Sequence, residues 1–241
     1  TVLSRGLGDV YKRQPPNTEG EPTAKCLIFV TPDAQRSMNT FLGASTELRP
    51  SDISKDLIGR SKILYLEGYL WDPPNAKKAF LEAINIAKAA DTKVALSLSD
   101  AFCVDRYRSE FLDLVRTHVD ILFGNETELL SLYQVENLNE AIGLVQDDCE
   151  IVAVTRDSRG SIVIENKRVF EIAAQKIDAV IDTTGAGDLY ASGFLYGITR
   201  DMDIRQCGKL GGLVASSIIT QFGARPEESL MPLIDRVAVP N

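Results

Sequence analysis

The sequence contains few of the residues that build metal centres or disulfide frameworks. Its 241 residues include four cysteines and one histidine. The cysteines lie far apart and form no Cys-x-x-Cys pair, so their spacing excludes an assembled zinc site and is not typical of a secreted disulfide framework. We therefore expect a reduced, cytoplasmic compartment.

Long apolar runs and an excess of basic charge are also lacking. No apolar stretch is long enough to span a membrane, and the N-terminus has no apolar signal-peptide core. The net charge is −8 at pH 7, the opposite of what a nucleic-acid backbone binder needs. We expect neither membrane nor nucleic acid as a partner. A nucleotide can still be bound locally, by a helix N-terminus and a metal ion.

Several well-known catalytic motifs are missing from an otherwise ordinary globular composition. The chain is 44% hydrophobic and 25% charged, which excludes a disordered or fibrous protein. It has no Walker A sequence, no Gly-x-Ser-x-Gly and no His-Glu-x-x-His. P-loop kinase, α/β-hydrolase and zinc-protease interpretations are therefore unsupported.

The chain divides into three parts by sequence pattern. Residues 1–14 (TVLSRGLGDVYKRQ) lack an initiator Met, and we interpret them as a processing, cloning or assembly scar. Residues 15–47 begin with a turn-rich linker and continue with two apolar stretches, 25–31 and 37–42, that predict a small antiparallel hairpin. Residues 48–241 form the third part.

Apolar strands and amphipathic helices alternate in this third part. Expected strands are at 63–68, 94–98, 119–123, 151–155, 161–164 and 168–172, and expected helices are at 76–90, 107–117, from 126, at 138–146, 189–198 and 203–221. This alternation predicts a doubly wound, mostly parallel α/β sheet with helices on both faces. Ligands of such sheets bind beyond the carboxyl ends of the strands.

The segment DTTGAGD (182–188) is the strongest chemical signal. Two glycines open a helix whose first amides are unpaired, which suits a phosphoryl group. Asp188 beside such an anion pocket makes sense if it accepts a proton from an attacking hydroxyl. The alternative is that Asp188 is an acid at a helix start and the glycines only make a tight turn.

These residues resemble the C-terminal signature of the ribokinase/PfkB family of carbohydrate and nucleoside kinases. Further segments are similar to its adenosine-kinase-like branch: 31–45, 63–72, 96–108 and 123–128. The resemblance runs from about residue 15 to the C-terminus. It implies a ribokinase-like α/β core with a small β lid (15–47), and ATP-dependent phosphorylation of a nucleoside or sugar hydroxyl.

The resemblance assigns catalytic roles residue by residue. It makes Asp188 the general base and the amides of Gly185, Ala186 and Gly187 an anion hole. Asn125 and Glu128 match the family's Asn-x-x-Glu motif, in which Glu128 organises Mg²⁺ and phosphate through water. The same spacing is typical of a helix capping box, and a surface-facing Glu128 is compatible with both roles.

The resemblance also implies nucleotide contacts. Thr155 and Gly160 match a Thr-x-Gly-x-x-Gly turn, although Asp157 stands where the family has glycine, and a simple hairpin turn explains Asp157 equally well. Gly212 falls where the family holds the adenine of ATP, but close helix packing also explains its small size. Arg36 is either a charge clamp from the lid or an exposed strand arginine.

Other polar and aromatic residues have alternatives of the same kind. Asp182 and Thr184 match positions whose backbone carbonyls hold a monovalent cation, possible K⁺ ligands, and side-chain hydrogen bonds within a turn are the alternative. For Arg106 we favour a surface salt bridge over a contact with ligand. We expect Tyr69 and Trp71 to pack in the core or against the lid.

The leading hypothesis is an ATP-dependent kinase most like adenosine kinase, acting as a monomer or homodimer on a small molecule. A ribose- or fructose-type sugar kinase is the first alternative. An inactive fragment or nucleotide-binding module is the second, which is favoured by Asp157 and by the absence of the family's first strands and most of its lid ahead of residue 15. Stacked aromatic residues would favour a purine acceptor over a sugar.

Overall fold

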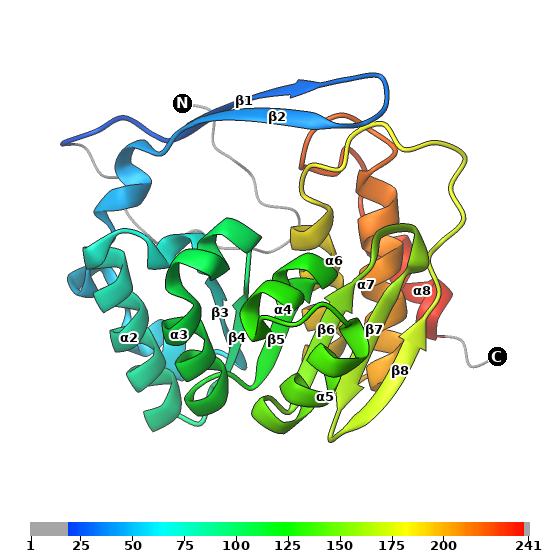
Figure 1. The fold of residues 1–241 in the computed structure, drawn as a ribbon. Helices are drawn as coiled ribbons and strands as arrows, with labels where there is room; N and C mark the ends of the chain where they lie inside the picture. Colours follow the sequence, from blue (N-terminus) through cyan, green and yellow to red (C-terminus); the bar gives the residue numbers. More distant parts are fainter. Residues whose placement is uncertain (1–18, 239–241) are drawn as a thin grey trace.

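The computed structural model describes residues 19–238 (Figure 1). The interpretation of residues 1–14 lies outside this range, as do the first residues of the linker. The strands are β1 (Lys25–Val30), β2 (Arg36–Phe41), β3 (Ile63–Glu67), β4 (Lys93–Ser97), β5 (Ile121–Asn125), β6 (Ile151–Thr155), β7 (Ser161–Glu165) and β8 (Arg168–Ile172). The α-helices are α1 (Lys55–Gly59), α2 (Pro74–Ala89), α3 (Ala101–Thr117), α4 (Glu126–Tyr133), α5 (Leu138–Asp148), α6 (Ala186–Thr199), α7 (Ile204–Ile218) and α8 (Met231–Ala238). Short 3₁₀ helices are η1 (Gly43–Glu47), η2 (Pro50–Asp52), η3 (Gly68–Trp71) and η4 (Asp157–Arg159).

The main sheet has the strand order β3-β4-β5-β6-β7-β8. The pairs from β3 to β6 are parallel, and β7 and β8 add an antiparallel end. The strands β4, β5 and β6 are almost continuously apolar and buried, as a sheet covered on both faces requires. The predicted mostly parallel α/β fold is confirmed.

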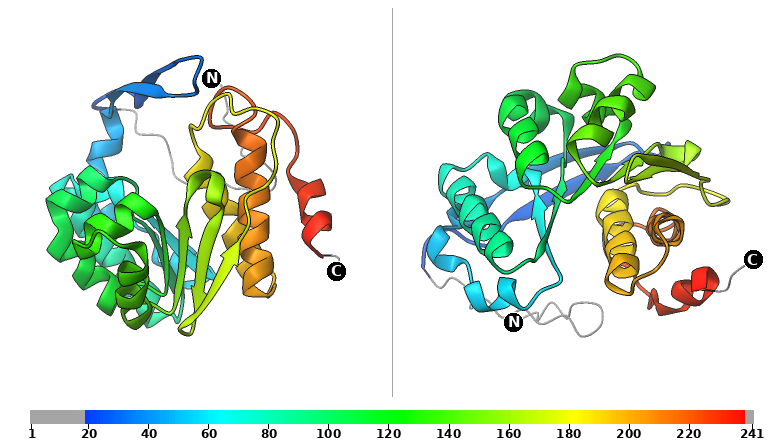
Figure 2. Two further views of the ribbon diagram at one scale, coloured as in Figure 1. Left: turned by 45° about the vertical axis from the view of Figure 1, so that its right-hand side comes forward. Right: turned by 90° about the horizontal axis from the view of Figure 1, so that it is seen from below.

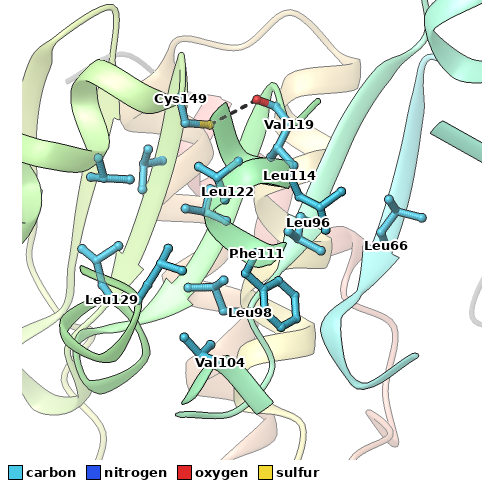
Figure 3. Packing of buried hydrophobic residues seen from close by; sticks show 14 of the residues in the cluster. Leu66, Leu96, Leu98, Val104, Phe111, Leu114, Val119, Leu122, Leu129 and Cys149 are labelled. Carbon is cyan, nitrogen blue, oxygen red and sulfur yellow. Dashed lines mark hydrogen bonds between the residues drawn. The ribbon is translucent and has the colours of Figure 1, made fainter. Parts of the chain in front are cut away.

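Two helical layers cover the sheet (Figure 2). On one face α2, α3, α4 and α5 pack through Phe80, Phe111 and Leu129 against residues such as Leu96 and Leu122; part of this cluster is drawn in Figure 3. On the other face α6 packs through Phe194 against Phe123 of β5, with ring centroids 5.4 Å apart. Among residues 19–238, no helix has the length and apolar character that crossing a membrane demands.

The hairpin of β1 and β2 forms a sheet of its own, separate from the main sheet. It lies over the ends of the main-sheet strands, on the side where α6 begins (Figure 1). The predicted antiparallel hairpin is confirmed. The division of the chain at residues 14 and 47 stays a prediction.

Candidate active site

The N-terminus of α6 forms an open surface lined with backbone donors. Gly185 precedes the helix with a left-handed φ of 80°, and a Cβ there would lie 2.8 Å from the Cβ of Ala224. Ala186 donates its amide to the carbonyl of Thr183 at 3.2 Å, whereas the amides of Gly187 and Asp188 have no acceptor among the described residues. A Cβ on Gly187 would meet no atom within 4 Å. An anion can therefore approach this helix end closely.

Asp188 lies in the first turn of α6, with its side chain open to solvent rather than turned into the core. The protein around the carboxylate removes part of its hydration, and this desolvation raises the pKa of Asp188 above its ordinary value. A carboxylate of raised pKa is a better proton acceptor than a free aspartate.

Glu67, at the end of β3, is a second carboxylate of this site that the sequence reasoning missed. The hydroxyl of Tyr65 donates to its Oε2 at 3.2 Å, and the hydroxyl of Ser99 donates to its Oε1. Burial is the largest cause of its raised pKa, and the negative charge of Asp188 adds to it. A cavity of about 640 Å³ beside β3 reaches Tyr65 and Glu67. The signal in the sequence was a glutamate that ends an apolar strand.

Glu128 closes a capping box at the start of α4. Its Oε2 accepts the amide of Asn125 at 3.0 Å, its Oε1 accepts from the side-chain nitrogen of Asn125 at 2.7 Å, and its own amide donates back to Asn125 Oδ1 at 2.9 Å. The residue is only 7% exposed, so Glu128 is not the surface-facing side chain that we considered compatible with both roles. This burial raises the pKa of Glu128 to about 7.

The turn after β6 lies directly beside this capping box. Asn125 and Thr155 are register partners at the ends of β5 and β6. Asp157 adopts a φ of 49°, so it takes up the left-handed conformation for which the family pattern has glycine. Gly160 is required by space as well as by its φ of 80°, since a Cβ would lie 2.0 Å from the carbonyl oxygen of Ile172.

Arg36 links the hairpin to the start of α6. It is the first residue of β2, and its guanidinium donates to the hydroxyl of Thr183, two residues before Gly185. Of the two alternatives, this contact favours a hairpin arginine that reaches the site. Its proposed role as a charge clamp stays a prediction.

Asp182 and Thr184 stabilise the same turn through their side chains. The carboxylate of Asp182 is 2% exposed and accepts from the amide and hydroxyl of Thr184, at 2.9 and 2.6 Å, and from the amide of Gly223 at 2.9 Å. Turn stabilisation thus explains both side chains, and the proposed K⁺ ligands are their backbone carbonyls. Within residues 19–238, no cluster of three or more His, Cys, Asp or Glu residues is arranged to hold a metal ion.

Gly212 lies on α7 and borders open space. A Cβ on Gly212 would meet nothing within 4 Å, whereas one on the neighbouring Gly211 would lie 2.9 Å from the carbonyl oxygen of Tyr190 in α6. Close helix packing therefore accounts for Gly211 but not for Gly212, which leaves Gly212 accessible to a ligand.

The sequence was also compared with models of known protein families. The model for the pfkB family of carbohydrate kinases matches residues 10–230. The chain belongs to the pfkB family. The chain is similar to the structure of an adenosine kinase from Sinorhizobium meliloti, with a TM-score of 0.88 and 49% sequence identity. The match covers 91% of this chain and 68% of the adenosine kinase chain.

Two further relatives of the chain are named as kinases of other substrates. The structure of a probable sugar kinase from Rhizobium etli has a TM-score of 0.87 and is 49% identical, over 89% of this chain and 66% of that one. A 5-dehydro-2-deoxygluconokinase from Listeria monocytogenes is 29% identical over 80% of this chain. The chain spans 61% of the length of that Listeria relative.

Two exposed aromatic side chains stand at the same edge of this pfkB-family sheet. Tyr69 of η3, which follows β3, is 57% exposed, and Phe102 in the first turn of α3, after β4, is 81% exposed. We call this pair the aromatic rim. Desolvation is the largest cause that raises the pKa of Tyr69 to about 12, and the negative charges of Asp100 and Glu128 add to it.

The exposures of Tyr69 and Trp71 separate the two alternatives that we gave for this segment. Trp71 lies in the core, at 3% exposure, whereas Tyr69 does not, and its packing against the lid stays a prediction. Arg106 forms the predicted surface salt bridge, with Asp72 at 2.7 Å. Phe102 was missed, because its place in the pattern is that of an ordinary helix residue, and only the structure turns it outward.

Proposed function

We propose that the protein transfers the γ-phosphoryl group of ATP to a hydroxyl group of a nucleoside. The observation that carries this proposal is the Asp188 carboxylate, of raised pKa, directly beside the free amides at the start of α6. Asp188 accepts the proton of the acceptor hydroxyl, whose oxygen then attacks the γ-phosphorus while the bond to the β-phosphate oxygen breaks. Of the three amides that the resemblance assigns to the anion hole, that of Ala186 already donates to Thr183. The amides of Gly185 and Gly187, together with that of Asp188, stabilise the charge of the transferred group.

The other predicted residues fit a nucleotide at the same edge. Thr155 and Gly160 line one side of it, Gly212 offers space for the adenine, and Arg36 approaches the phosphates from the hairpin. Glu128 is the candidate that holds Mg²⁺ through water, and the ion would supply positive charge to the phosphates. A carboxylate whose pKa is about 7 can release its proton when a cation binds nearby.

The aromatic rim supports a nucleoside rather than a plain sugar as the acceptor. A nucleobase gains about 1–3 kcal/mol by stacking on an aromatic side chain, whereas a small sugar has no comparable flat apolar face. The sugar-kinase alternative is supported by Glu67, whose carboxylate near Asp188 can accept hydrogen bonds from sugar hydroxyls. Measured phosphorylation of adenosine and of ribose distinguishes the two.

The variant Asp188→Asn tests the phosphotransferase proposal. We expect turnover to fall by roughly 10²–10⁴-fold, because the general base is lost, while ATP affinity stays within about twofold. Phosphoryl transfer is measured with radiolabelled ATP, and ATP affinity by calorimetry. Wild-type turnover in the variant would remove Asp188 from its role. ATP binding with no transfer to any acceptor by the unmodified chain would instead support a nucleotide-binding module.

A further inference from the structure

The two residues of the aromatic rim lie on two separate segments, and side-chain contacts join these segments. Tyr69 belongs to η3, and Phe102 belongs to the first part of α3. Helix α3 is not regular, because Tyr107 has non-helical angles (φ −122°, ψ 26°). Residues 101–106 therefore form a short segment before a kink, and their direction depends on what holds the kink.

Asp72, the residue directly after η3, binds both residues at the kink. Its Oδ1 accepts from Arg106 Nη1 at 2.7 Å and from the hydroxyl of Tyr107 at 2.6 Å. These two hydrogen bonds lower the pKa of Asp72, and the bond to the carboxylate raises the pKa of Tyr107. An exposed ion pair alone contributes little, but a short hydroxyl–carboxylate bond is directional and stronger.

Additional contacts join η3 to α3 on both sides of the kink. Before it, the thiol of Cys103 donates to the carbonyl of Gly68 at 3.4 Å. After it, the indole nitrogen of Trp71 donates to Glu110 Oε2 at 3.1 Å. The ammonium of Lys77 binds the same oxygen at 2.6 Å and lies 4.7 Å from the centre of the Tyr107 ring. These contacts fix the position of η3 relative to α3.

We propose that Asp72 and Tyr107 are positioning residues for recognition of the acceptor's base. They fix η3 relative to the first turn of α3, so that Tyr69 and Phe102 meet a flat heterocycle in a preformed arrangement. Neither Asp72 nor Tyr107 touches the base itself. A preformed surface binds more tightly because less side-chain and loop ordering is needed when the ligand arrives. This inference rests on the proposed nucleoside acceptor.

The test compares equilibrium binding of adenosine and of ATP by calorimetry in the 241-residue chain. For Asp72→Ala and Tyr107→Phe we expect adenosine binding to weaken about 5–20-fold, with ATP binding unchanged. The double variant should be no weaker than Asp72→Ala, because both changes remove the same bond. Asp72→Asn keeps an acceptor for the Tyr107 hydroxyl, so it should retain most of the affinity.

A control is Asp147→Ala, which removes another exposed ion pair, with Lys167 at 2.6 Å, distant from the rim. It should leave both ligands unaffected. Equal weakening of adenosine and ATP in the Asp72 and Tyr107 variants would indicate a general loss of structure and overturn the inference. Unchanged adenosine binding in these variants would also overturn it, while the proposed function stands. Absence of adenosine binding in the unmodified chain would instead refute the proposed acceptor, and the inference with it.

Discussion

Glu128 combines two demands on one side chain at the residue scale. Its hydrogen bonds with Asn125 complete the start of α4, and its burial makes the charged form unfavourable. The bond from the Asn125 amide favours the charged carboxylate, but burial outweighs it, so the charged state lowers the stability of the fold. A nearby cation would remove this penalty.

The pH dependence of stability tests this description. The folded-state pKa of about 7 lies above the ordinary value of 4.5, so between these values the folded chain holds more protons than the unfolded chain. The free energy of unfolding should therefore fall as the pH rises through this window, by about 1–3 kcal/mol from pH 5 to pH 8. Glu128→Gln should show a smaller fall, because glutamine cannot ionise.

Urea denaturation of both chains at several pH values measures the effect. The partly buried Glu67, whose pKa is also raised, contributes in the same direction, so the difference between the two chains isolates Glu128. Glu136→Gln, at an exposed glutamate, is the control and should follow the wild-type curve. Identical slopes for Glu128→Gln and wild type would mean that the Glu128 carboxyl group titrates normally.

At the scale of elements, two neighbouring glycines of α7 have different surroundings: one packs against α6 and the other faces open space. Gly211 is needed because α6 lies too close for a larger residue, whereas Gly212 borders open space. The open space at Gly212 is where we propose that the adenine of ATP binds. The sequence alone cannot show which glycine in a run of small residues packs against a helix and which faces open space.

Two alanine substitutions make this separation measurable. Gly212 and Gly143, on α7 and α5, both border open space. Alanine at either position should stabilise its helix by about 0.5–1 kcal/mol, because glycine loses more backbone freedom on folding. Only Gly212→Ala should weaken ATP binding, by several-fold, as measured by calorimetry beside urea denaturation. Equal ATP affinity in the two variants would mean that the adenine does not approach Gly212.

The elements differ in how far the sequence predicts them. The central strands follow from unbroken apolar runs, and the hairpin 161–172 follows from its turn. The start of α3 was predicted at Tyr107, and the structure begins it at Ala101. The kink at Tyr107 interrupts the helical period, so only the second part shows a continuous apolar stripe. The short helices α1 and α8 were also missed, since they are too short to show a clear period.

At the scale of the whole molecule, the same residue types occur in the hydrophobic core and at the proposed ligand site. Asn125, Thr155 and Gly160 were predicted from the family resemblance, and Asp188 was predicted from the resemblance and from the glycine-rich helix start that precedes it. Glu67 and Phe102 were not, because their importance depends on which loops the sheet order brings together. Phenylalanine in particular carries no sequence sign of whether it faces the core or solvent.

A pair of phenylalanine truncations demonstrates this contrast. Phe194 is fully buried between Phe123 and Tyr190, whereas Phe102 is the exposed member of the rim. Phe194→Ala should lower the free energy of unfolding by about 3–5 kcal/mol. Phe102→Ala should change it by no more than about 0.5 kcal/mol and should lower adenosine affinity instead. Denaturation and calorimetry on both chains measure the two effects, and a large stability loss in Phe102→Ala would contradict its assignment to the rim.

The separate sheet of the β1–β2 hairpin has a kinetic consequence. All residues of β2 are exposed, and the hairpin shares no strand pairing with the main sheet. Its backbone amides should therefore exchange with deuterium well before those of β4 and β5, which open only when the core does. In the proposed role of a lid, a hairpin that opens independently would let reactants enter and products leave while the helices and strands beneath keep their packing.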